Sequence, residues 1–315
     1  MATVQAPVRG TQSFVRTLTL CWGQPSLTGL EVAWRWLVGI PALWFVVVQA
    51  RRILMRYTGD GFDMQRVGLD PKLLGDPVGA LTADPMGVVG KFTAAAAVVA
   101  PDLLHLTARS MPVLIVIWIV VSSLGRTFVL RRAEPRLRAR PATLMALQVI
   151  RVAALAGAFG VWYWCVRTAG RVTVSAPIAA HQEPNLVGYC ALTIIASLTL
   201  FVLWGIVSWI FSMAPLLAML HDVAALPALR ESVRLGPIRS KLVEINLVMG
   251  IVKIALMVLA LVFSACPLPF ESVTTPGFLA WWCVGVSLFY VVASDFFHVA
   301  RLVAYLELWR VYEAV

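Results

Sequence analysis

The chain has 315 residues, of which 60% are hydrophobic and 13% are charged, and its formal net charge is +10 at pH 7. Soluble domains carry about 45–50% apolar and about 25% charged residues, so this composition excludes an ordinary water-soluble fold and indicates a multi-pass membrane protein. The positive charge would also fit a nucleic-acid-binding protein, but no signature of DNA or RNA binding accompanies it. Arginines and lysines that face anionic headgroups explain the same charge, so we expect no nucleic-acid partner.

Six stretches of the chain are apolar and long enough to cross about 30 Å of hydrocarbon as helices. The first stretch is short but rich in tryptophan, as is typical of a span with an aromatic anchor at the membrane interface. A long polar or mixed segment precedes it, so we expect a retained span and not a cleaved signal peptide. The predicted spans are 33–50, 111–130, 142–164, 187–211, 242–265 and 278–298. The sequence therefore predicts an all-α polytopic membrane protein with a single integral membrane domain, 1–315.

Residues 86–110 interrupt this simple pattern. The uncharged run 92–101 is too short to cross the membrane, and charged or polar residues flank it on both sides. We predict an interfacial or re-entrant helix here, with Pro101 opening a helix that continues into the span 111–130. The alternative is a seventh span. The whole outer segment 51–110 includes a part rich in Gly, Pro and Asp, which we expect to fold as a small cap.

The arginines give the expected orientation, because short cytoplasmic loops of membrane proteins hold most of the Lys and Arg. Six spans with both termini in the cytoplasm place the basic loops 131–141 and 212–241 and the basic C-terminal tail on the cytoplasmic side. Arg51, Arg52 and Arg56 do not fit this arrangement, and only a seventh span would bring them inside. The preference for Arg over Lys, with much Ala and Val, is typical of a high-GC bacterium, so we expect the bacterial inner membrane.

Ionisable side chains within the hydrocarbon are costly, and each is therefore a functional hypothesis. Arg151 and Lys253 are the deepest, and Lys253 shares one helical face with Asn246. If the two faces meet, they form a cationic groove open to the cytoplasm, which would suit a small anion or a lipid headgroup. The candidate groove residues are Arg126, Arg151, Asn246 and Lys253. The alternative is ordinary helix packing by small residues and Asn, with Arg and Lys extending to the interface.

A second candidate group lies near the cytoplasmic surface: Glu244, Asp295, His298 and Arg301. Asp295 and His298 are three positions apart on the last helix, so they share a face. These residues fit either an orienting set of ion pairs or a proton relay. Beyond them, residues 298–315 are amphipathic, which predicts a surface helix or a helix that binds other membrane proteins. Membrane lipids are the other expected partners.

The motifs of common catalytic and metal sites are absent from the sequence. It has no GxSxG elbow, HExxH motif, Walker A loop or GxGxxG run, and the cysteines have no CxxC spacing. We expect no catalytic residues, no metal and no cofactor. Cys165, Cys190, Cys266 and Cys283 fall on the outer halves of the predicted spans, where an oxidising periplasm would permit a disulfide.

One local pattern carries a resemblance to known proteins. Within residues 212–250, a span ends in a proline-containing apolar stretch, and the sequence ALRESVRLG, basic residues and another span follow. This order resembles uncharacterised bacterial multi-pass proteins, among them those similar to the membrane domain fused to glycerophosphodiester phosphodiesterases. The resemblance implies a helical membrane domain with a juxtamembrane cytoplasmic helix. It carries over neither phosphodiesterase chemistry nor any functional residue.

The leading hypothesis for the function is therefore a non-enzymatic structural, assembly or regulatory membrane component. It depends on the missing catalytic motifs, the amphipathic C-terminal segment and the tryptophan-rich spans. The alternative is a transporter or lipid-handling protein that uses the cationic groove, and a lipid-modifying enzyme comes third.

Overall fold

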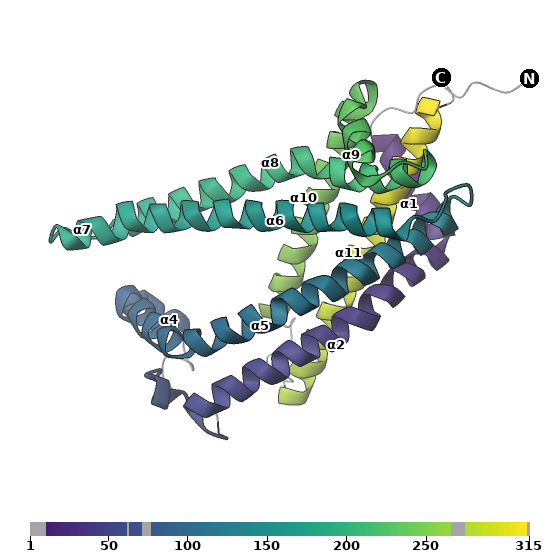
Figure 1. Ribbon diagram of the computed structural model, residues 1–315. Helices are drawn as coiled ribbons and strands as arrows, with labels where there is room; N and C mark the ends of the chain where they lie inside the picture. Colours follow the sequence, from purple (N-terminus) through teal and green to yellow (C-terminus); the bar gives the residue numbers. More distant parts are fainter. Residues whose placement is uncertain (1–10, 62, 71–76, 266–274, 314–315) are drawn as a thin grey trace, which may run out of the picture. The chain divides into compact units, whose positions relative to one another are not determined.

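The computed structural model describes residues 11–61, 63–70, 77–265 and 275–313, and all regular structure in them is helical (Figure 1), so the all-α prediction is confirmed. Six helices are long and apolar enough to cross a membrane, and each predicted span falls on one of them. These helices cover Pro25–Thr58, Met86–Ala133, Pro141–Ala179, Leu186–Leu220, Arg239–Ser264 and Gly277–Val311. The chain is thus a multi-pass integral membrane protein.

The chain packs as two compact units, each with its own buried core. The smaller unit is Trp34–Val121, and we call it the insert unit. The larger unit joins the described residues up to Ala33 with the chain from Ser122 onward, and we call it the main unit.

The insert unit contains most of α2 (Pro25–Thr58), the 3-10 turn η1 (Met64–Val67), α4 (Pro77–Ala83) and the first part of α5 (Pro85–Ala133). Its core is apolar and comes from all parts of the unit except α4, which packs against it. The buried members are Ile53, Val67, Leu69, Val88, Ala95 and Val99.

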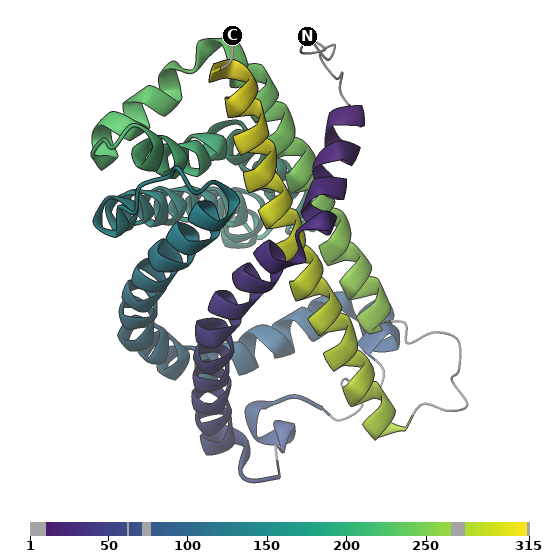
Figure 2. The ribbon, with the colours of Figure 1, turned by 90° about the vertical axis from the view of Figure 1, so that its right-hand side faces the viewer.

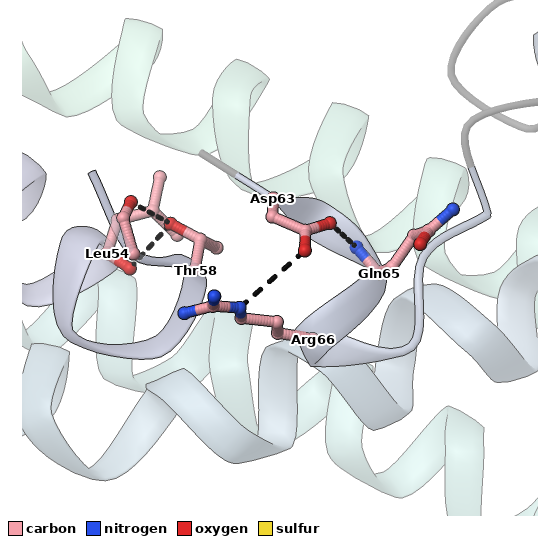
Figure 3. A network of polar contacts seen from close by, with 6 residues as sticks. Leu54, Thr58, Asp63, Gln65 and Arg66 are labelled. Atoms are coloured by element: carbon pink, nitrogen blue, oxygen red, sulfur yellow. Dashed lines mark hydrogen bonds and ion pairs between the residues drawn. The ribbon is translucent and has the colours of Figure 1, made fainter. Parts of the chain in front are cut away.

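Polar contacts hold the short turn η1 at the end of α2 (Figure 3). The Asp63 carboxylate accepts a hydrogen bond from the Gln65 backbone N–H at 3.1 Å and lies 3.6 Å from the Arg66 guanidinium. Gly68 ends the turn at a φ of 82°, a conformation that glycine adopts at no steric cost. The Thr58 hydroxyl donates to the Leu54 carbonyl at 3.0 Å, which satisfies the hydroxyl within the last turn of α2.

The helix α5 corrects the prediction for residues 86–110. These residues are helical, but they are continuous with the next span, and Pro101 and Pro112 lie inside the 49-residue helix. Pro101 therefore does not open a helix. At 1.5 Å per residue, α5 is roughly 70 Å long, more than twice the thickness of the hydrocarbon. Membrane helices tolerate internal prolines because neighbouring groups satisfy the freed backbone carbonyls.

The main unit is built on two helix pairs. The helix α6 (Pro141–Gly170) packs along α8 (Leu186–Leu220), and α10 (Arg239–Ala265) packs along α11 (Pro276–Glu313), as Figures 1 and 2 both show. The helix α10 also packs on α8, which joins the pairs. Two shorter helices also belong to the unit: α1 (Thr11–Gly23) packs on α11, and α9 (Ala225–Arg234) packs on α8 and α6. The start of α2 and the end of α5 belong to it as well.

Local sequence explains several of the helix boundaries. Pro141 begins α6, where its missing N–H costs nothing. A π-helical turn, η2 (Arg171–Ser175), and a short helix, α7 (Ala176–Ala179), extend α6 beyond Gly170. Asn185 caps α8 by accepting a hydrogen bond from the Gly188 N–H at 2.7 Å.

The core of the main unit lies at one end of its long helices, which we call the packed end. Here the second half of α8 meets the start of α10 and the end of α11, and Met213, Leu217, Leu242 and Tyr305 are almost fully buried. Toward the other end, large apolar side chains are exposed, for example Leu198 at 58% and Phe289 at 61%. Such surfaces suit contact with lipid acyl chains, which are as apolar as leucine.

Candidate functional site

A layer of polar side chains is buried in the main unit, and we call it the polar layer. Its members come from the starts of α2, α6 and α10 and from the later parts of α5, α8 and α11. Consecutive spans alternate in direction, so these helix segments belong to the same side of a membrane. The buried members are Glu31, Ser122, Ser123, Arg126, Thr127, Gln148, Ser208, Ser212, Asn246, Asp295 and His298.

Asn246 on α10 joins three helices of the polar layer. Its amide nitrogen donates to the Gly205 carbonyl at 2.6 Å and to the Ser208 hydroxyl at 2.7 Å, both on α8. Its amide oxygen accepts from Arg301 Nη1 at 3.2 Å and, more weakly, from the Tyr305 hydroxyl at 3.4 Å, both on α11. An asparagine amide offers two donors and two acceptor positions, so the protein uses the whole capacity of this side chain.

His298 links Arg301 to Glu31 at the start of α2. Arg301 Nη2 lies 2.9 Å from His298 Nδ1. A guanidinium can only donate, so Nδ1 accepts, and the neutral ring carries its proton on Nε2. Nε2 lies 3.5 Å from a carboxylate oxygen of Glu31, a side chain with no exposed surface. This tautomer presents an N–H to the carboxylate, which partly offsets the cost of burying a charge.

The four candidate groove residues lie on α5, α6 and α10. Asn246 forms hydrogen bonds with Arg301 and Tyr305, and Arg151 is half-buried on α6. Lys253 is half-buried seven positions further along α10, or about 10 Å by helical rise. Arg126 is buried on α5. The helix α8 packs against both α6 and α10.

The second candidate group lies on α10 and α11. His298 and Arg301 are in contact, and Asp295 is buried one turn before His298. Glu244 is exposed, and no contact between it and this pair is seen in the described part of the chain. Sequence reasoning missed Glu31 and Tyr305. Glu31 precedes the first apolar stretch by only two residues, so a charge at the edge of a span was the available signal.

The arginines of the loop between α5 and α6 contact the packed end. The backbone N–H of Arg138 donates to the Met219 carbonyl at 3.1 Å, and its guanidinium lies 3.0 Å from Asp222. Arg140 also pairs with Asp222. Hydrogen bonds from Arg140 and, secondarily, Arg138 hold the pKa of the Asp222 carboxyl below its usual value. These two arginines therefore tie the loop to the end of α8. This structural role is separate from the effect of their charge on the orientation of the chain in the membrane.

The amphipathic segment at the C-terminus packs inside the protein. Of the residues that the sequence places on its apolar face, Val299, Leu302, Leu306 and Trp309 are buried and Val303 is half-buried. Val299, Leu306 and Trp309 belong to cores of the main unit. Their neighbours belong to α1, α8 and α10. The apolar face predicted to bind a surface or a partner is thus covered by the chain itself.

Cysteines and metal-ligating residues were also candidate features. Cys165, Cys190 and Cys283 are free thiols, as is buried Cys21, and Cys266 lies outside the described residues. Among the described residues, no group of three or more His, Cys, Asp or Glu side chains is placed to hold a metal.

An apolar groove of about 550 Å³ lies between α10 and α11, away from the polar layer. Phe263, Phe278, Trp281 and Phe289 are among its lining residues. The Trp282 indole N–H, also at the groove, donates to the Phe263 carbonyl at 2.7 Å, so it is already satisfied within the protein.

Comparison with known proteins gives no match to a family model, to a curated protein or to a solved structure. The resemblance of residues 212–250 to bacterial multi-pass proteins therefore stays a prediction.

Proposed function

We propose that this chain is a non-enzymatic structural, assembly or regulatory component of a bacterial inner membrane, with both termini in the cytoplasm. The observation that carries the proposal is the hydrogen bonding of Asn246, whose donors and acceptors all go to side chains or backbone of α8 and α11. A buried polar group used in this way fixes how helices pack, as interhelical hydrogen bonds do in membrane proteins. It leaves that side chain no capacity for a ligand.

The proposed orientation rests on where the basic residues lie. The loop 134–140, the segment 221–238 and the end of α11 all belong to the packed end, and the arginines of each carry the positive charge expected of cytoplasmic loops. Arg56, one of the three arginines that do not fit, lies 3.6 Å from Asp102 in the insert unit. This ion pair partly neutralises the positive charge of Arg56 locally.

The experiment that tests the proposal is purification of the tagged chain from its native membrane in a mild detergent. We expect a particle heavier than the 34.4 kDa chain with its detergent, containing a second membrane protein in fixed stoichiometry. A multi-pass protein of similar size with the same tag, purified in parallel, identifies non-specific companions. A homogeneous monomer that carries only lipid would contradict an assembly role.

The second candidate function is transport or lipid handling, which Arg151 and Lys253 favour. Both are half-buried cations within membrane-spanning helices, where ionisable groups often mark a pathway. Native mass spectrometry of the purified protein tests this role. If anionic phospholipid stays bound to the wild type and is lost from Arg151→Gln and Lys253→Gln, lipid handling replaces the leading proposal.

A further inference from the structure

The helix α9 is held at the level of the membrane surface by its connections. Four residues separate its first residue, Ala225, from the end of the membrane-spanning helix α8 at Leu220. Its last residue, Arg234, precedes α10 by one 3-10 turn, η3 (Gly236–Ile238). Both neighbours cross the membrane, and α9 packs on α8 and α6, so it cannot extend far from the bilayer.

The two faces of α9 differ sharply. Ala228 and Ser232 face inward with no exposed surface, and the Ser232 hydroxyl is satisfied by the Leu229 carbonyl at 2.7 Å. On the opposite side, Leu226 and Val233 are 54% and 53% exposed and lie two helical turns apart. The packing of α9 within the chain thus leaves the apolar side chains of Leu226 and Val233 uncovered.

The uncovered face of α9 is also cationic. Arg230 and Arg234 are exposed and lie beside Leu226 and Val233 on a helical projection. The acidic residue of the helix, Glu231, is turned toward His221, whose Nδ1 lies 3.0 Å from its carboxylate. Arg239 and Lys241, at the start of α10, are exposed as well and extend the positive charge.

We propose that the outward face of α9 binds an anionic bilayer surface. Leu226 and Val233 enter the boundary between headgroups and acyl chains, and Arg230 and Arg234 contact lipid phosphates. This pairing of apolar and basic residues is what binds interfacial helices to anionic lipid. Charge complementarity selects the anionic lipid as the occupant, and the connections of α9 keep the helix near the lipid. The inference rests on the membrane-spanning fold and is independent of the proposed assembly role.

Hydrogen–deuterium exchange of the full chain in lipid nanodiscs tests the proposal. One set of discs holds only phosphatidylcholine, and the other holds about one-third phosphatidylglycerol. We expect peptides from α9 to exchange several-fold more slowly in the anionic discs, and 0.5 M NaCl to remove most of this difference because salt screens surface charge. A peptide around exposed Gln182, between α7 and α8, is the internal reference.

Two paired variants make the test specific. Arg230→Gln with Arg234→Gln should abolish the lipid dependence, whereas Arg230→Lys with Arg234→Lys should keep it, because the lysines preserve the charge. Equal exchange of α9 in both discs would overturn the proposal. An acidic protein would then be the next candidate to bind the outward face of α9. A lipid dependence that survives the glutamine pair would overturn it too. Neither outcome bears on whether a partner copurifies with the chain.

Discussion

Arg310, near the end of α11, donates two hydrogen bonds to one carboxylate oxygen of Glu134, at 2.6 Å from Nη2 and 3.2 Å from Nε. The two residues are 176 positions apart, so this contact closes the C-terminal helix onto the loop after α5. The hydrogen bond from Arg310 is also the main reason that the pKa of Glu134 lies below its ordinary value of 4.5.

The first prediction concerns the pH dependence of this contact. A carboxyl with a lowered pKa stabilises the fold fully above the ordinary value of 4.5, and the contribution disappears as pH falls through the lowered pKa. We expect Glu134→Gln to reduce the free energy of unfolding by up to about 1 kcal/mol at pH 7, as for a largely solvent-screened pair. At pH 3 the difference from the wild type should shrink. Thermal unfolding in detergent at both pH values measures it.

Arg131→Gln is the matched control, because Arg131 is an exposed arginine on the same segment. Its removal should change stability equally little at both pH values. A loss in Glu134→Gln that is as large at pH 3 as at pH 7 would show that packing, and not charge, explains the contact.

The second prediction concerns Asn246. Replacing it with Leu keeps a similar volume but removes one partner of half-buried Arg301 and one of the buried Ser208 hydroxyl. We expect a loss of about 1–3 kcal/mol in the free energy of unfolding, since unsatisfied buried groups pay their full desolvation cost. Denaturant titration in detergent, followed by tryptophan fluorescence, measures this loss.

Glu244→Gln provides the comparison for Asn246→Leu, because Glu244 is exposed two positions earlier on α10. Its effect should stay within about 0.5 kcal/mol, as is usual for surface substitutions. If Asn246→Leu is as stable as the wild type, the hydrogen bonds of Asn246 do not stabilise the packing of α8, α10 and α11. The main support for the proposed function then fails.

The third prediction concerns the close approach of α8 and α10 at Gly205. A Cβ at this position would lie 2.8 Å from Leu247 Cδ2, closer than real contacts permit. Gly205→Ala should therefore force the Leu247 side chain to move, and the cost of this shift should offset the stability that alanine gains in a helix. Leu247→Ala makes room for the new methyl group. The double variant should be more stable than the sum of the single effects, with a coupling of about 0.5–3 kcal/mol.

Gly157→Ala controls for helix propensity, because a Cβ there meets nothing within 4 Å. This variant should gain up to about 1 kcal/mol in stability. Additive effects of Gly205→Ala and Leu247→Ala would contradict the predicted contact between the helices.

The spans were predictable because apolar length is a local property of the sequence. Pro101 shows where such reasoning stops, since a proline can begin a helix or lie within one, and only the surrounding packing decides. The same applies to the C-terminal helix: its apolar stripe was predicted correctly, but a stripe does not tell whether its partner is another protein or the same chain. Here α1, α8 and α10 cover it.

The polar layer was predictable only in part. A helical stripe on α10 singled out Asn246, and the spacing of the last span singled out His298. Their partners come from other helices: Arg301 is 55 positions from Asn246, and Glu31 lies at the opposite end of the chain from His298. Tertiary packing selects such pairs, and residue spacing within one helix carries no signal of them.

The last prediction concerns the reactivity of Cys21 on α1. Burial, and secondarily the negative charge of Glu307, raises the pKa of this thiol to about 11. The thiolate is the reactive form, and at pH 8 it would be about one part in a thousand of the total. In the folded protein we expect N-ethylmaleimide to modify exposed Cys190 first and Cys21 only after unfolding. Mass spectrometry of peptides from a time course measures both rates.

The variant Glu307→Gln separates the two causes of this low reactivity. It removes the negative charge but leaves Cys21 buried, so the thiol should react only slightly faster than in the wild type. A Cys21→Ala variant identifies the slowly reacting peptide, which it should lack. If Cys21 reacts in the folded wild type as fast as Cys190, then α1 does not cover it, and the packing of α1 on α11 does not persist in solution.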